Sequence, residues 1–137
     1  MEREQLNYYL QHTDGKDIDS IQTSIEEQAT VELIQKPTAQ TLLVPVQDPI
    51  TGGTFYGGEV LVTSAIAKVD GINGWAMVLD DTPQRAVSIA VLDAAFAAGI
   101  LQQEIIALGL QGKEKLDQEQ SKLNGNVQAT RVAFDLL

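Results

Sequence analysis

The sequence contains no cysteine and only one histidine, His12. Without cysteine, the chain has no disulfides, no thiolate nucleophile and no zinc–thiolate or iron–sulfur ligands. One histidine cannot build a multi-histidine metal site. The aromatic residues are one Trp, three Tyr and three Phe, too few for a surface that stacks nucleobases. These absences exclude most templates of enzyme chemistry.

Positive charge is also scarce. Nine Lys and Arg stand against 19 Asp and Glu, which gives a net charge of -10. This surplus repels phosphate backbones and anionic lipids, so we expect neither a nucleic-acid binder nor a membrane binder.

Long apolar runs are missing as well. Residues 1–10 have no apolar segment typical of a signal peptide. Residues 86–110 are the most apolar stretch, but polar side chains interrupt it, and a membrane span needs ~20 consecutive apolar residues. We therefore expect a soluble cytoplasmic protein. Its 137 residues, 44% of them hydrophobic, are expected to form a single domain over residues 1–137.

Two amphipathic helices are predicted at the start of the chain. Residues 3–12 place Leu6, Tyr9 and Leu10 on one face, and Asp14-Gly15 is typical of a turn. In a second helix, capped by Asp17, apolar residues recur at helical spacing; they are Ile18, Ile21 and Ile25.

The strand patterns indicate an α+β fold with a mainly antiparallel sheet of four to five strands. Apolar runs at 31–35, 41–47, 59–69 and 75–79 predict strands, and alternation over 132–136 predicts a last one. Pro45 favours an edge strand or a bulge for residues 41–47. Residues 59–69 are apolar on both faces, which favours a central strand. A hairpin connection is predicted at residues 70–74.

A long apolar helix is predicted after this hairpin. Thr82 can cap it, Pro83 suits its first turn, and Gly99 is its expected stop. Its wheel is apolar nearly all round, which predicts burial nearly all round. Two explanations stay open: part of the helix is exposed as a partner site, or the first two helices fold back and cover it. Further helices are predicted at 101–108 and 113–123, separated by Gly109 and Gly112.

Asp93 lies on the more apolar face of this long helix, where an unpaired carboxylate would be costly. We favour a structural ion pair, with Arg131 or Lys68 as the cation, over a catalytic acid. A metal site with oxygen ligands is not favoured, because only two of the acids that could form it are close in sequence, Asp80 and Asp81. The other acids considered for this site are Glu59, Asp70 and Asp93. A phosphate-binding loop at residues 109–113 is rejected because Glu114 replaces the required Ser or Thr. The sequence therefore assigns no catalytic, metal-binding or cofactor-binding residue.

Four segments resemble the PhnG family of phosphonate metabolism. Residues 55–63 match its F-x-x-G-E-x-x-x-T pattern, with Glu59 and Thr63 at the last two fixed positions. Val-Asp-Gly at 69–71 with Gly74, Ala-Val-Leu-Asp-Ala-Ala at 90–95, and Ala-Thr-Arg-Val-Ala-Phe at 129–134 also resemble family segments, in the same order and spacing. The resemblance covers residues 3–137.

The resemblance implies an accessory or scaffold subunit of the carbon–phosphorus lyase core complex. Its partners would be PhnI-, PhnH- and PhnJ-type subunits. The complex would support formation of a ribose 1-phosphonate 5-triphosphate from ATP and a phosphonate, with release of adenine, and the nucleosidase chemistry is attributed to the PhnI type. No cofactor is implied for this subunit. The candidate structural or interface residues are Glu59, Thr63, Trp75, Asp93, Phe96, Arg131 and Phe134.

The sequence departs from the family in two places. Ser64 stands where members usually carry arginine, and the chain ends soon after Phe134, without the usual aromatic residues and Arg-Gly pair. Loss of these cations weakens any role in holding phosphonate or triphosphate. Two alternatives stay open: an enzyme that acts alone on ATP or a phosphonate through Glu59, Asp93 and Arg131, and a homo-oligomeric interaction module.

Overall fold

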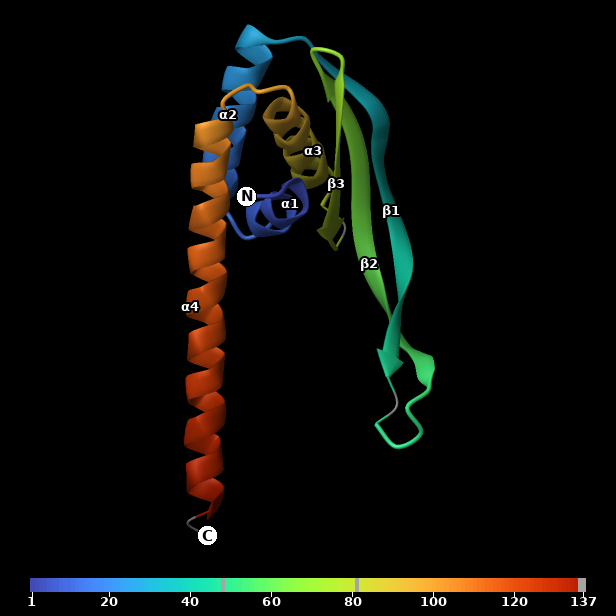
Figure 1. Ribbon diagram of the computed structural model, residues 1–137, viewed down its shortest axis with the longest axis vertical. Coiled ribbons are helices and arrows are strands. Elements are labelled where there is room, and N and C mark those ends of the chain that lie inside the picture. The colour runs from blue at the N-terminus through green and yellow to red at the C-terminus, as the bar shows by residue number, and fades with distance from the viewer. Residues whose placement is uncertain (48, 81, 136–137) are drawn as a thin grey trace.

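The computed structural model describes residues 1–47, 49–80 and 82–135 and has an α+β fold (Figure 1). The described elements are four helices and a three-stranded antiparallel sheet. The helices lie on one side of the sheet and leave its other side bare (Figure 1). The elements in chain order are α1 (Arg3–Leu10), α2 (Gly15–Gln28), β1 (Val31–Gln47), β2 (Thr54–Val69), β3 (Ile72–Leu79), α3 (Pro83–Ala97) and α4 (Gln102–Asp135).

The strand order is β1-β2-β3, so β2 is central, as predicted for residues 59–69. The two apolar runs predicted as separate strands, 31–35 and 41–47, form one strand, β1. Register shifts between Leu33 and Thr38 accommodate Pro37 within this strand. A further register shift lies between Val44 and Pro45. The prediction that Pro45 lies in an edge strand or at a bulge is confirmed.

The predicted C-terminal strand is wrong. Residues 102–135 form one continuous helix, α4, and this removes the fourth strand from the described sheet. Alternation over five residues is too short to identify a strand when the preceding residues are already helical. The expected four to five strands are therefore three among the described residues.

A tight turn connects β2 to β3. Asp70 and Gly71 both have positive φ, 48° and 84°, the combination that a two-residue hairpin turn of the primed type requires. The connection is shorter than the predicted 70–74, because Ile72 and Gly74 already belong to β3. The Asp70 carboxylate also accepts from the N–H of Thr30 at 2.9 Å, which fixes the start of β1 beside the turn.

Helix α3 is the centre of the core. It begins at the predicted residues, with Thr82 at the N-cap position and Pro83 in the first turn, and Gly99 follows it with φ 81°. The predicted cap itself is not made, because the Thr82 hydroxyl donates to the carbonyl of Leu79. Residues 88–95 are all buried, between the sheet on one side and the helices on the other (Figure 1). Of the two explanations that the sequence left open, the exposed partner site on this helix is therefore wrong. The N-terminal helices fold back and cover it, as the other explanation states.

The two glycines predicted to interrupt α4 lie inside it. They allow α1 to cross α4 closely: a Cβ on Gly109 would meet the side chain of Leu6, and a Cβ on Gly112 would meet the backbone carbonyl of Tyr9 and the hydroxyl of Thr13. That hydroxyl donates to the carbonyl of Leu108 at 2.7 Å and joins the two helices. The helix tolerates these glycines because tertiary packing outweighs their poor helix propensity.

Gly112→Ala should lower the free energy of unfolding by about 2 kcal/mol, because the new methyl group meets fixed backbone atoms of α1. Helix propensity alone predicts the opposite sign, a gain of up to about 1 kcal/mol. Urea unfolding followed by circular dichroism measures the difference. Gly109→Ala is the matched control and should cost less, since the nearest atom is the movable end of Leu6. An equal increase in the free energy of unfolding for both variants would contradict the close crossing of α1 and α4.

Two elements extend beyond the packed body. Strand β3 pairs with β2 only as far as Val62, so the remainder of β1 and β2 is a two-stranded ribbon. We call residues 41–47 and 49–61 the hairpin arm. The C-terminal part of α4 projects in the same general direction (Figure 1). Isolated two-stranded ribbons are marginally stable in water, so the hairpin arm is suited to contact with another protein.

Candidate functional site

Helix α1 closes the free edge of β3 with a ladder of polar side chains. Arg3, Asn7 and Gln11 are spaced by four residues, which rise about 6 Å along a helix. Alternate strand residues are about 6.8 Å apart, so each side chain reaches the next outward-facing backbone group. Arg3 Nη2 donates to the carbonyl of Asn73 at 3.1 Å, Asn7 Nδ2 to that of Trp75 at 2.7 Å, and Gln11 Nε2 to that of Met77 at 3.0 Å.

Asp93 anchors this edge from α3. Its side chain is 4% exposed, and its carboxylate accepts from Arg3 Nε at 3.1 Å, from Arg3 Nη2 at 2.8 Å and from the backbone N–H of Trp75 at 3.0 Å. The hydrogen bonds to Asp93 raise the pKa of the Arg3 guanidinium above its ordinary value, so the pair stays charged. These contacts tie α1, β3 and α3 together.

The cation that pairs with Asp93 was missed by the sequence analysis, which named Arg131 and Lys68. Arg3 lies 90 residues away in the chain. The available signal was the spacing of Arg3, Asn7 and Gln11, which places three long polar side chains on one face of the first helix.

Thr63 fixes the connection from β3 to α3. It is buried, and its hydroxyl donates to the carbonyl of Asp80 at 2.7 Å and accepts from the N–H of Thr82 at 3.1 Å. Asp80 has φ 69°, a left-handed conformation that asparagine and aspartate tolerate better than most residues. Thr63 therefore sets where α3 begins.

The candidate residues do not form a single cluster. Trp75 contacts Asp93 through its backbone N–H, and Thr63 lies at the other end of α3. Phe96 is half-buried against the core, Glu59 is exposed in the hairpin arm, and the Trp75 side chain is 48% exposed. Arg131 and Phe134 belong to α4, and their side chains lie outside those that the structure describes.

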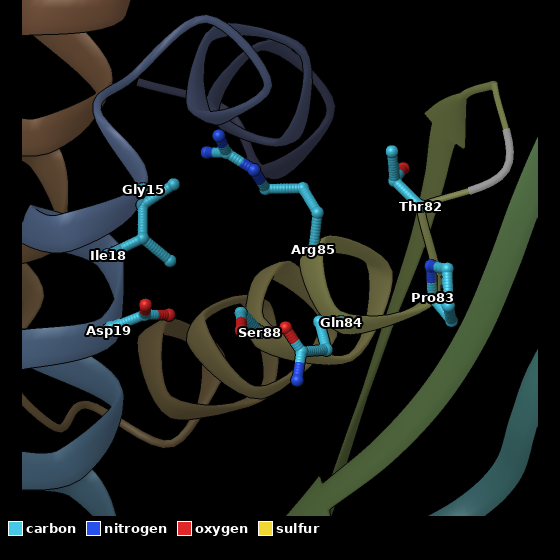
Figure 2. A pocket seen from close by; sticks show the side chains of 8 residues that line it. All are labelled: Gly15, Ile18, Asp19, Thr82, Pro83, Gln84, Arg85 and Ser88. Atoms are coloured by element: carbon cyan, nitrogen blue, oxygen red, sulfur yellow. The ribbon is translucent and has the colours of Figure 1, made fainter.

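The pocket in Figure 2 lies between α2 and the start of α3 and has a volume of about 590 Å³. Asp19 faces Gln84 and Ser88 across it, while Arg85 turns toward the α1–α2 turn (Figure 2). Arg85 Nη1 donates to the carbonyl of Thr13 at 2.9 Å, and the Ser88 hydroxyl donates to Gln22 at 2.6 Å. These polar groups are engaged in joining helices, and among the lining residues none forms a pair of nucleophile and base.

An apolar groove of about 470 Å³ lies where the bare face of the sheet meets α1. Cross-strand register places Leu42 opposite Val60 and Leu79 opposite Val62, so the three strands share this face. Tyr8 of α1 and Gln11, the C-cap residue of that helix, border it. The apolar strand residues that line the groove are Leu42, Leu43, Pro45, Val60, Val62, Trp75, Met77 and Leu79. We call this surface the sheet groove.

Titratable groups do not converge elsewhere in the part of the chain that the structure describes. No three His, Asp or Glu side chains there are close enough to hold a metal ion. Asp81, one of the acids weighed in the sequence analysis, lies outside the described residues. His12 packs edge-on against the Tyr8 ring, with centroids 5.3 Å apart.

Comparison with known proteins gives a family match. The family model described as phosphonate metabolism protein PhnG matches residues 1–137, the whole chain. No curated protein matches the chain. Among the described residues, no helix combines the length and apolar character needed to cross a bilayer.

Proposed function

The chain belongs to the PhnG family of phosphonate metabolism proteins, and from this premise we propose that it is a non-catalytic accessory subunit of the carbon–phosphorus lyase core complex. In this proposal the whole chain acts as one interaction module for PhnI-, PhnH- and PhnJ-type subunits. The complex would displace adenine from ATP with a phosphonate to give a ribose 1-phosphonate 5-triphosphate. The PhnG-type subunit would position the catalytic subunits.

The observation that supports this role is the sheet groove. Trp75 and Leu79 are about half exposed and lie on a face that the described helices leave bare. A large aromatic side chain in an apolar depression is typical of the anchor residues that dominate binding energy between proteins. Leu42 and Val60 of the hairpin arm line the groove, so a partner seated there would also contact the arm.

Glu59 gives a second, weaker support. Of the two charged or polar residues in the F-x-x-G-E-x-x-x-T segment, Thr63 is explained by its buried hydrogen bonds. Glu59 is exposed in the hairpin arm and makes no hydrogen bond or ion pair with another described residue. A partner cation would give this carboxylate a role, which fits a docking contact better than catalysis.

The test is co-purification with tagged PhnI- and PhnH-type subunits. Trp75→Glu and Leu79→Glu should each weaken association about 30-fold, since loss of an interface anchor costs about 2 kcal/mol or more. Ile72→Glu is the matched control: it lies in the same strand, is 42% exposed and does not line the groove. The affinity of this control variant for the PhnI- and PhnH-type subunits should change by less than about threefold.

Thermal unfolding by circular dichroism checks that all three variants fold. If the unmodified chain fails to associate with these subunits, or if it releases adenine from ATP and methylphosphonate alone, the proposed role is wrong. An equal effect of Ile72→Glu and Trp75→Glu would contradict docking at the sheet groove.

A further inference from the structure

Strand β1 is an edge strand with an unusually open pairing surface. It is 17 residues long, and among the described strands it pairs with β2 on one side only. Its middle part, residues 38–44, contains no charged residue and lies between Pro37 and Pro45. Natural edge strands usually carry lysine, proline or bulges that prevent pairing with another chain. Here those features stand at the two ends of the segment and leave its centre unprotected.

The direction of the free backbone groups follows from the ladder. Asp70 N–H bonds to the carbonyl of Thr30, and Asp80 N–H to that of Leu61. The backbone N–H and C=O groups of even-numbered β2 residues therefore point toward β1, and those of odd-numbered residues point toward β3. Gln40 and Leu42 lie opposite even-numbered β2 residues, so their backbone groups bond to β2. The N–H and C=O groups that point outward belong to Ala39, Thr41 and Leu43.

These outward positions are self-complementary. In an antiparallel pairing of two copies centred on Thr41, Ala39 of one copy lies opposite Leu43 of the other, and the two Thr41 residues face each other. Three facing pairs that each exchange two bonds give about six main-chain hydrogen bonds, within the about 10 ± 5 found in a typical interface. Antiparallel pairing is also the arrangement that a two-fold axis normal to the sheet requires.

Charge and exposure favour a second copy as the occupant. Two chains of charge -10 repel each other, but the facing segments, residues 38–44, are neutral. The same register brings the tip of one hairpin arm toward the beginning of β1 in the other copy. Ile50 at that tip is 91% exposed, and Leu33 and Ile34 at the beginning of β1 are each about half exposed. Pairing would therefore cover apolar surface at both ends of the neutral segment.

We propose that two copies of this chain associate through antiparallel pairing of residues 38–44 of β1, which joins their sheets into one six-stranded sheet. This inference does not depend on the proposed function, although Leu42 and Leu43 belong to both surfaces: the sheet groove uses their side chains, and the pairing uses the backbone groups along the edge of β1.

Sedimentation equilibrium up to about 100 µM, above the micromolar dissociation constants of modest interfaces, should show a dimer of the unmodified chain. Thr41→Pro removes the outward N–H in both copies and spares the bonds to β2. It should raise the dissociation constant about 30-fold through loss of two hydrogen bonds. Thr41→Val keeps the N–H and should stay within about threefold of the unmodified chain.

Single cysteines give a second measurement, because the chain has none of its own. Facing residues in an antiparallel pair have Cα atoms about 5.5 Å apart, inside the disulfide range. Thr41→Cys should therefore cross-link rapidly under mild oxidation. Gln40→Cys is the neighbouring control; its side chain points to the other face and lies opposite Leu42, so it should cross-link at least about tenfold more slowly.

A monomeric chain at the highest concentration would overturn the proposal. So would a dimer unaffected by Thr41→Pro, or equal cross-linking of the two cysteine variants, since either result would place the contact on another surface. If the chain stays monomeric but Thr41→Pro abolishes binding to a partner subunit, a strand of that subunit takes the edge and the pairing of two copies is wrong. Failure of groove variants to bind partner subunits would contradict the proposed function only.

Discussion

Gly74→Ala should lower the free energy of unfolding by about 3 kcal/mol and the melting temperature by roughly 10 °C. A Cβ at this position would lie within 2.6 Å of the backbone carbonyl oxygen of Ala90 and of the Cα of Ala94, and closer still to the N of Ala94. No side-chain rotation relieves a contact with backbone atoms, so α3 must move away from β3. That movement would loosen the packing of the whole helix, because residues on every side of it are buried.

Gly58→Ala is the control for this experiment. Gly58 also lies in a strand, but a Cβ there would meet nothing within 4 Å. The substitution should be neutral or stabilise by up to about 1 kcal/mol, since alanine restricts the unfolded chain. Chemical denaturation of both variants gives the comparison. A Gly74→Ala protein as stable as the control would mean that α3 does not rest on β3 at this distance.

The same contact explains part of the family resemblance in physical terms. Gly74, Ala90 and Ala94 are small because β3 and α3 approach closely, and Thr63 and Asp93 hold the two ends of that contact by buried hydrogen bonds. In the described structure, these motif residues build the fold. Glu59 differs, since the described structure gives it no structural role, and for that reason it is the motif residue we assign to a partner.

Local patterns predicted where α3 begins but not how continuous the elements are. They also gave the wrong cap for α2, where Asp14 rather than Asp17 accepts from the N–H of Lys16. The N-cap region of α3 and the edge position of Pro45 depend on neighbouring residues, and both were predicted. The length of α4 was not, because Gly109 and Gly112 are poor helix formers that pack against α1. The joining of residues 31–47 into one strand depends on bulges beside Pro37, which pairing with β2 determines and the local sequence does not.

The candidate site depends on contacts that are distant in the chain, which limits what the sequence can predict. Burial of Asp93 and its need for a cation followed from its position on an apolar face. The identity of that cation did not, because Arg3 and Asp93 meet only after α1 has folded back over α3. Coverage of α3 by the N-terminal helices has the same origin. The bare face of the sheet was missed because the strand patterns do not reveal on which side the helices pack.

Asp93→Ala should destabilise the protein by about 3 kcal/mol, the lower end of the cost of breaking a buried ion pair, because the Arg3 side chain is 44% exposed. The variant leaves the N–H of Trp75 without its acceptor and Arg3 without its anion. Arg3→Ala should cost about 2 kcal/mol by leaving a buried carboxylate with one remaining donor. The double variant should cost less than the sum, with a coupling energy of about 1.5 kcal/mol, as expected for groups in direct contact.

Lys68→Ala and Arg131→Ala provide the controls, since the sequence analysis considered both cations as partners of Asp93. The destabilisation caused by each variant should add to that of Asp93→Ala, with a coupling energy below about 0.5 kcal/mol. Arg3 introduces no pH dependence between pH 5 and 9: its raised pKa means that its stabilisation is complete below the unfolded value and is lost only as the pH rises through the higher folded value. The coupling measured from urea unfolding should therefore be unchanged by the ionisation of Arg3 across this range. Coupling of Asp93 to Lys68 or Arg131 in place of Arg3 would show that α1 does not close the edge of β3. The sheet groove would then lack the side that α1 forms.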